Sequence, residues 1–328
     1  MRLTTRPSWL VPFYPAADFK RVGRLRRPGQ QLLSPGTSSR RIADQPSTTR
    51  PRLTKRNLLL GAGGVLTVLT GGVAYVLSEL DAEHADYTAP ETQPMLTTRG
   101  RLGDDGNTPT VATEGEWSFT DADELFLFVH GFDTDPQAAR DQTYTLDVGL
   151  EEYRSSPVAG YSWDSDGEWA DAKRVADANG EPLADWLAEW AAEDGRPVHL
   201  IGYSLGARVV CEALTELETN ETATSLASVS LLGGAIPSDS VERDGEYGDA
   251  IAALDAPMTN FHSGRDRVLG WIYRLSDRTT AVGSVGIDDP AAAPDGYRDV
   301  NVTDLVTDHY SYFEPGEGSL SRVVDSLD

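Results

Sequence analysis

VHLIGYSLG, residues 198–206, is the stretch of this sequence that decides the fold. Its first four residues form an apolar run typical of a buried strand, and a helix is predicted from about Leu205 onward. Between them, Ser204 occupies a sharp strand-to-helix turn, and Gly202 and Gly206 leave room for the strand and the helix to approach closely. The N-terminus of the helix favours negative charge that develops beside it. Ser204 is therefore a candidate nucleophile, and the alternative interpretation is a plain glycine-rich turn.

Strands and helices alternate on both sides of this motif. The run LFLFV, residues 125–129, is apolar throughout, as in a strand that is buried on both faces. Further strands are predicted over 158–163, 226–232, 257–262 and 300–302, and helices over 136–153, 182–192 and 206–217. Such alternation predicts the α/β class, with a mostly parallel central sheet covered by helices on both faces.

With its serine motif in this setting, the chain resembles the α/β-hydrolase superfamily over about residues 110–328. The resemblance implies a serine nucleophile, an acid and a histidine in that chain order. Ser204 matches the nucleophile position. A serine hydroxyl needs a histidine as general base, and a carboxylate that holds the imidazole in the right tautomer.

The histidine and the acid are assigned by their places after predicted strands. Only one of the five histidines, His309, follows the last strand, and its segment TDHYSY (307–312) resembles the histidine loop of the family; a surface histidine is the alternative. The other four are His84, His130, His199 and His262. Asp266 stands just beyond the strand 257–262, where the acid loop of the family lies, whereas Asp255 precedes that strand and Asp277 lies beyond a later apolar segment.

The segment HGF, residues 130–132, resembles the His-Gly motif that follows the third strand in this superfamily. Gly131 lets the loop curl, so the resemblance implies an oxyanion hole made by the backbone N–H groups of Phe132 and Leu205. We expect His130 to support the loop rather than to transfer protons. The run GYSWD (160–164) is similar to a lipase-like subset, and Trp163 is expected either to line an acyl pocket or to lie in the core.

The resemblance implies a serine hydrolase that cleaves carboxylic esters through an acyl-enzyme, without a metal or an organic cofactor. A peptidase or a thioesterase would use the same triad, and a non-catalytic hydrolase-like binding module at the cell surface is the alternative from another class. Only 24 residues separate Leu232 from Pro257, which leaves room for a small lid, and the segment 276–299 is expected to be a surface loop.

Charge is distributed very unevenly along the 328 residues. Residues 1–60 hold 13 of the 28 basic residues and two of the 52 acidic ones, so the remainder has 15 basic and 50 acidic residues, a net charge of −35. Lys173 is the only lysine in that remainder, a composition that resembles proteins of extreme halophiles; an ordinary acidic enzyme is the alternative. So acidic a chain is not expected to bind nucleic acid. With Cys211 as its single cysteine, it can form neither an intramolecular disulfide nor a cysteine metal cluster.

The N-terminal part has a different character. Residues 1–57 are predicted to be a disordered basic leader, and 58–77 (LLLGAGGVLTVLTGGVAYVL) form an uncharged run long enough to span a membrane as a hydrophobic helix. Basic residues before it and acidic ones after it place the rest of the chain outside the cytoplasm. The run is either an anchor or an export signal, since TKRNLL (54–59) resembles a twin-arginine motif; a buried soluble helix is the alternative. We expect a polar tether over 78–110 and the hydrolase domain over 111–328, with a cytoplasmic enzyme if translation starts at Met95.

Overall fold

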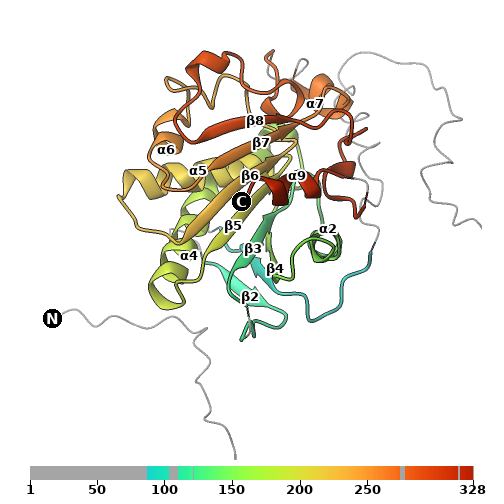
Figure 1. Ribbon diagram of the computed structural model, residues 1–328. Coiled ribbons are helices and arrows are strands. Elements are labelled where there is room, and N and C mark those ends of the chain that lie inside the picture. The colour runs from blue at the N-terminus through green and yellow to red at the C-terminus, as the bar shows by residue number, and fades with distance from the viewer. Residues whose placement is uncertain (1–86, 103–109, 121, 274–277, 317, 328) are drawn as a thin grey trace, which may run out of the picture. The chain divides into compact units, whose positions relative to one another are not determined.

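The computed structural model describes residues 87–102, 110–120, 122–273, 278–316 and 318–327, all within the compact unit Leu69–Asp328. Within these residues, eight strands form one sheet in the order β2-β1-β4-β3-β5-β6-β7-β8 (Figure 1). The β1–β2 pair is antiparallel, and every other neighbouring pair is parallel. This sheet confirms the predicted α/β class. The strands are β1 (Met95–Thr97), β2 (Ala112–Glu114), β3 (Leu125–Val129), β4 (Val158–Ser162), β5 (Val198–Tyr203), β6 (Leu226–Leu232), β7 (Met258–His262) and β8 (Tyr297–Asn301).

Strand β3 shows why both faces of the sheet are covered. Leu125, Leu127 and Val129 belong to one hydrophobic core, and Phe126 and Phe128 belong to the other, because successive side chains of a strand point to opposite faces. All five are buried, and each fully buried side chain of this size contributes roughly 1.5–3 kcal/mol relative to exposure. An apolar run without alternation therefore needs a layer of helices on each side.

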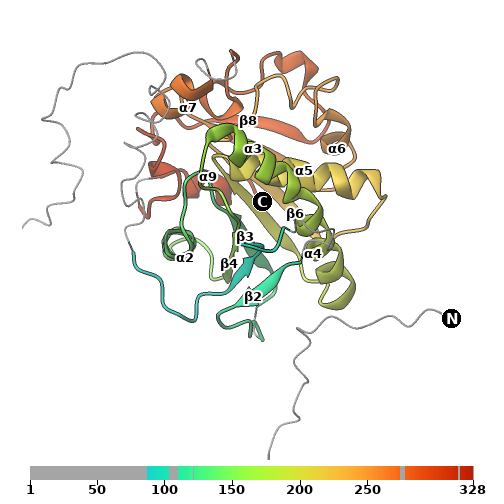
Figure 2. The same ribbon diagram turned by 180° about the vertical axis from the view of Figure 1, so that it is seen from behind.

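The helices form those two layers. Helices α2 (Pro136–Glu151) and α9 (Leu320–Asp325) cover the core that contains Phe128. The other face is covered by α3 (Trp169–Ala178), α4 (Gly180–Glu193), α5 (Gly206–Thr219) and α6 (Gly248–Ala252), as Figure 2 shows from behind.

Helix α2 begins as the sequence predicts. Pro136 stands in its first turn, where a missing N–H costs nothing, and the Asp135 side chain accepts a hydrogen bond of 2.8 Å from Ala138 N. Helix α3 was not predicted, because four of the ten residues in its sequence WADAKRVADA are charged and it buries only one large side chain, Trp169, with Ala172 and Ala176. Small apolar residues at helical spacing give a weak hydrophobic pattern.

The folded domain begins before the predicted boundary between residues 110 and 111. Strand β1, which falls in the segment predicted as a polar tether, pairs with β4 inside the sheet, and Leu96 is fully buried. Its three residues are too few to show a periodic pattern. Strand β1 also pairs with β2, in antiparallel orientation, at one edge of the sheet.

The prediction of a surface loop over 276–299 is wrong for its described part. Residues 282–285 form the short helix α8 (Val282–Val285), and Ala281 and Val282 are fully buried. Gly283 donates to Gly234 O at 3.0 Å and accepts from Ser263 N at 3.0 Å. The small residues that suggested a loop instead allow close backbone packing.

The predicted leader and the hydrophobic helix over 58–77 lie outside the described residues. Of the helices that the structure describes, none combines the length and the apolar character required to span a bilayer.

Candidate active site

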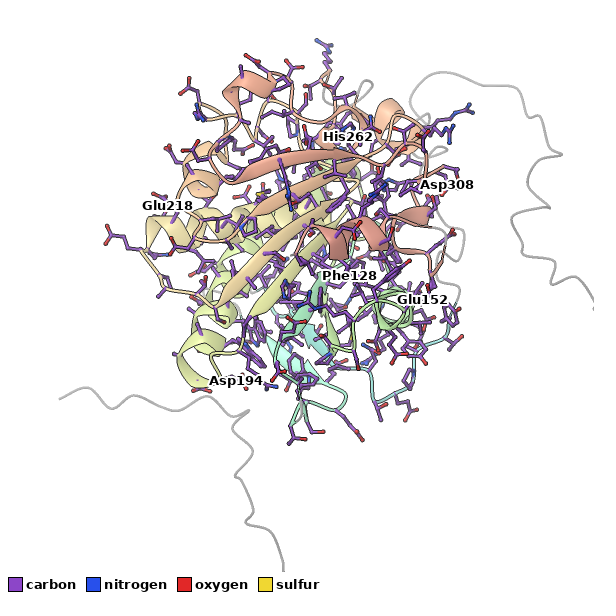
Figure 3. All side chains as sticks on the ribbon, viewed as in Figure 1. Phe128, Glu152, Asp194, Glu218, His262 and Asp308 are labelled. Carbon is purple, nitrogen blue, oxygen red and sulfur yellow. The ribbon has the colours of Figure 1, made fainter. Side chains whose placement is uncertain are left out.

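Four loops that carry the predicted site residues leave the sheet at one edge. They follow β3, β5, β7 and β8, which run parallel, so their carboxyl ends meet at the same side of the sheet. In Figure 3, His262 and Asp308 lie on the side where these strands end. Asp194, which follows α4, and Glu218, in the last turn of α5, lie on the opposite side.

Ser204 adopts a left-handed backbone conformation, with φ of 52°. Its N–H donates to Leu232 O at 3.0 Å and its carbonyl accepts from Ala235 N at 2.9 Å, so the end of β6 and the loop after it hold the turn from both sides. A strained φ in a residue other than glycine persists only where neighbours fix it in this way.

The two glycines beside Ser204 have the packing role predicted for them. A Cβ at Gly202 would lie 2.9 Å from Ala207 Cα, which is too close for helix α5 to stay in place. A Cβ at Gly206 would collide with the backbone of Val129 and His130 at the end of β3. The first glycine therefore permits the approach of helix α5 to β5, and the second permits the approach of the start of α5 to the end of β3.

Ser204, His309 and Asp266 form one chain of hydrogen bonds. His309 Nε2 lies 2.8 Å from Ser204 Oγ, and His309 Nδ1 lies 2.7 Å from Asp266 Oδ2. All three residues are buried, at 6%, 4% and 3% exposure. The carboxylate is acceptor only, so Nδ1 carries the proton and Nε2 accepts from the serine hydroxyl.

Asp266 is fixed by a second role at the start of helix α7 (Arg267–Ile272). Its Oδ1 accepts from Leu269 N at 3.1 Å as the helix N-cap, which leaves Oδ2 for the imidazole. Ser263 ties this loop to the histidine loop, since its hydroxyl donates to Val306 O at 2.8 Å.

His309 is also held by Tyr203, the last residue of β5. The Tyr203 hydroxyl donates to His309 O at 2.9 Å, and the two rings lie 5.2 Å apart, centroid to centroid. Burial raises the pKa of Tyr203 well above its ordinary value, so the phenol keeps its proton and remains a donor. Sequence reasoning did not single out Tyr203.

The loop 130–134 after β3 packs directly against the serine. A Cβ at Gly131 would lie 2.7 Å from Ser204 Cβ. His130 is buried, with its Nδ1 2.8 Å from Gly131 O and its Nε2 3.1 Å from Trp163 N. Phe132 is half-buried, its ring 5.3 Å from that of Trp169, and Leu205 is buried at the start of α5.

Trp163 lies in the core, not in an acyl pocket. Its side chain is fully buried, its ring stacks on His130 with centroids 5.6 Å apart, and its Nε1 donates to His130 O at 3.0 Å. Of the two expectations for this residue, the structure supports the second.

The other histidines lie apart from the chain of hydrogen bonds. His199 bonds to Ser228 and Glu124 at the opposite ends of the strands, where burial lowers its pKa. His262 ends β7 and is half-buried, and His84 lies outside the described residues. The part of the chain that the structure describes holds no group of three or more His, Cys, Asp or Glu side chains that could bind a metal ion.

Arg99 is a further residue at this edge that the sequence did not indicate. It follows β1, and its guanidinium reaches the loop 130–134, with Nη2 2.5 Å from Thr134 O. The tripeptide Thr98-Arg99-Gly100 carries no local signal for such a contact, which spans 35 residues.

A family model described as "Protein of unknown function (DUF726)" matches residues 158–323, a range that contains Ser204, Asp266 and His309. Two similar proteins bear membrane-related names. An uncharacterized membrane protein of Schizosaccharomyces pombe (strain 972) is 31% identical over 150 residues, which are 45% of this chain and 18% of that protein. The transmembrane and coiled-coil domain-containing protein STS1 of Oryza sativa subsp. japonica is 33% identical over 160 residues, 48% of this chain and 23% of that protein. The chain thus matches less than a quarter of the length of either relative.

Similar solved structures include a lipase and a thioesterase. The mature form of the Bacillus licheniformis lipase BlEst2 has a TM-score of 0.40 at 18% identity, covering 62% of this chain and 91% of that one. YbtT, a type II thioesterase from the yersiniabactin biosynthetic pathway, has a TM-score of 0.39 at 12% identity, covering 63% of this chain and 94% of that one.

Proposed function

The chain belongs to the DUF726 family, and from its active-site geometry we propose that it is a serine hydrolase that cleaves carboxylic esters through an acyl-enzyme. The observation that carries the proposal is the continuous chain of hydrogen bonds from Ser204 through His309 to Asp266. A nucleophile, a base and an orienting carboxylate in hydrogen-bond contact are what acyl transfer requires.

In the proposed reaction, Ser204 Oγ attacks the ester carbonyl carbon while its proton passes to His309 Nε2. Asp266 stabilises the imidazolium through the Nδ1–H bond. Collapse of the tetrahedral intermediate breaks the bond to the leaving alcohol, which takes the proton from Nε2. A water molecule then gives a proton to Nε2 and attacks the acyl carbon. Collapse of this second intermediate breaks the bond to Ser204 Oγ, which takes the proton back from Nε2, and the carboxylic acid is released.

We assign the oxyanion hole to the backbone N–H groups of Phe132 and Leu205. Two features support this assignment: the loop before Phe132 packs against Ser204 at Gly131, and Leu205 stands at the N-terminus of α5, where the backbone dipoles favour negative charge. Removing one such donor typically lowers kcat by about 10² to 10³.

Turnover of a series of p-nitrophenyl esters of increasing acyl length tests the proposal, with a thioester and a peptide anilide of the same acyl group to compare leaving groups. The assays should be run in molar KCl, because residues 61–328 carry a net charge of −35 that salt would screen. Ser204→Ala should lower kcat by at least about 10³. Ser228→Ala is the matched control, a buried serine near the other end of the sheet, and should keep wild-type turnover. Wild-type turnover by Ser204→Ala would overturn the proposal, because another group would then be the nucleophile. Absence of turnover of any of these substrates by folded wild-type protein would overturn it as well, and would favour a binding module that keeps the fold without the chemistry.

We also propose that residues 58–77 hold the domain at a membrane, with residues after 78 on the extracytoplasmic side. The uncharged run and the membrane-related names of the two relatives support the membrane association, and the asymmetric flanking charges support the topology. The full chain should stay in the membrane pellet after alkaline carbonate extraction and should be digested when intact cells are treated with protease. Recovery in the supernatant, or resistance to protease until the cells are lysed, would contradict the proposal.

A further inference from the structure

We propose that Arg99 is a positioning residue for the reaction: its guanidinium fixes the loop 130–134 so that the Phe132 N–H faces the Ser204 side of the peptide. The inference rests on the proposed hydrolase function. It concerns a residue outside the Ser-His-Asp set and 105 positions before the serine in the chain.

The guanidinium of Arg99 joins the ends of three neighbouring strands. Arg99 follows β1, Ser162 ends β4 and His130 follows β3, and these strands are adjacent in the sheet in that order. Arg99 Nε donates to Ser162 Oγ at 2.7 Å, and Nη2 donates to Thr134 O at 2.5 Å and lies 3.2 Å from His130 Nε2. The side chain is only 14% exposed, so the contacts form away from bulk water.

These contacts determine which ring nitrogen of His130 carries the proton. Its Nε2 faces two donors, Arg99 Nη2 and Trp163 N, and must therefore be the unprotonated nitrogen. The proton lies on Nδ1, which donates to Gly131 O at 2.8 Å. Burial, together with the charge of Arg99, lowers the pKa of His130 to about 3, so the ring stays neutral in this tautomer at physiological pH.

The orientation of the Gly131 carbonyl then determines that of the next N–H. Gly131 O accepts from His130 Nδ1 and also from Thr134 Oγ1 at 3.2 Å. The described chain has no cis peptide bond, and in a trans peptide the C=O and the following N–H point in opposite directions. With the Gly131 carbonyl directed at His130, the Phe132 N–H is directed away from it. Arg99 holds both ends of this arrangement, His130 at the start of the loop and Thr134 at its end.

Arginine suits this position because it is a rigid fork. Its Nε contacts Ser162, its Nη2 contacts Thr134 and His130, and its Nη1 lies 3.7 Å from Asp164 Oδ1. Lysine would keep the positive charge, but its single ammonium cannot reach the same partners with the same planar geometry. The substitution Arg99→Lys therefore keeps the positive charge and removes the hydrogen bonds that position the loop 130–134.

The kinetic test compares Arg99→Lys with Arg154→Lys. Arg154 forms a comparable fork on Glu124, with Nε 2.6 Å and Nη2 3.2 Å from its carboxylate, next to the start of β3 at the far edge of the sheet. We expect Arg99→Lys to lower kcat for p-nitrophenyl acetate by about 10- to 100-fold, with KM changed less than about threefold. Arg154→Lys should keep wild-type kcat. An unchanged kcat in Arg99→Lys, or equal losses in both variants together with equal losses of thermal stability, would overturn the inference.

A second readout does not depend on turnover. Nitrogen NMR of histidine-labelled protein should show His130 as the neutral Nδ1–H tautomer in the wild type, and this signal should broaden or shift in Arg99→Lys but not in Arg154→Lys. An Nε2–H tautomer in the wild type would overturn the positioning role whatever the kinetics. If the wild type shows the expected tautomer but turns over no ester, the proposed function fails while the arrangement around Arg99 stands.

Discussion

Gly131 lies so close to Ser204 that a Cβ built on the glycine would stand 2.7 Å from Ser204 Cβ and 3.2 Å from Ser204 Oγ. The loop after β3 and the turn after β5 thus pack backbone against side chain at the point where the proposed nucleophile must stay free to move. A side chain at position 131 would displace either the hydroxyl or the loop.

Gly131→Ala should lower kcat on an ester by at least about 10² while the protein stays folded, since the strain falls on the proposed oxyanion loop. Gly270→Ala is the matched control, because a Cβ at Gly270 in helix α7 meets no atom within 4 Å. The control should keep wild-type kcat and become slightly more stable, since alanine favours a helix over glycine. Equal kinetics for the two variants, with circular dichroism confirming that both are folded, would show that the close contact has no role in turnover.

Asp266→Asn should separate the two roles of this residue. An asparagine still caps helix α7 by accepting from Leu269 N, but it brings no charge to stabilise the imidazolium of His309. We expect kcat to fall by roughly 10³ to 10⁴, with the free energy of unfolding changed by less than about 1 kcal/mol. Asp266→Ala should lose the cap as well and unfold more readily in urea. A kcat of Asp266→Asn within tenfold of wild type would mean that another group orients the histidine.

Gly283 joins several parts of the site through its backbone. Its carbonyl accepts from Ser263 N and from the Tyr312 hydroxyl, both at 3.0 Å, and a Cβ there would lie 2.6 Å from Gly233 Cα. Gly283→Ala should therefore cost about 1–3 kcal/mol of stability by overpacking. Ser284→Ala, which removes one hydrogen bond of 2.9 Å to Ala281 O, should cost about 1 kcal/mol or less. Urea unfolding measures both, and a smaller loss for Gly283→Ala than for Ser284→Ala would contradict the close packing of helix α8.

Asp147 on helix α2 should make stability depend on pH. Burial, with Glu151 one turn further on, raises the pKa of Asp147 from 3.8 to about 7. The folded state therefore keeps a proton that the unfolded state releases between these values, so stability falls as the pH rises from about 4 to about 7.

Asp147→Asn removes this penalty. The variant should match wild type in stability near pH 4 and exceed it by about 1–2 kcal/mol above pH 7. Glu151→Gln, which removes only the neighbouring charge, should give a smaller gain over the same range. Urea unfolding at constant salt from pH 4 to pH 8 measures the difference, and a gap between Asp147→Asn and wild type that stays constant over this range would contradict the raised pKa.

The elements with strong local signals were predictable from the sequence. The apolar run of β3 predicted a buried strand, and the motif around Ser204 predicted a strand followed by a sharp turn into a helix. The order of strands along the chain predicted Asp266 and His309 in the loops after β7 and β8, where the structure has them. The structure brings the three side chains together because parallel strands end at one edge of the sheet.

What the sequence could not show depends on packing between distant segments. Arg99 lies in a short polar stretch, and only the pairing of β1 with β4 carries it to the loop of His130. Helix α8 is built from small residues, whose use is close backbone contact and not a periodic pattern. In the sequence, Tyr203 is the last residue of an apolar strand, and only the structure shows that its hydroxyl bonds to His309 O.

The central claim is that Ser204 is a nucleophile activated by His309, and labelling by a fluorophosphonate in molar KCl tests it most directly. Intact mass should show one adduct on folded wild-type protein, and peptide mapping should place it on Ser204. Ser204→Ala should take no label, and His309→Gln should react at least about 10³ times more slowly. An adduct that maps to another residue, an equal adduct on Ser204→Ala, or no adduct on folded wild-type protein would contradict the account.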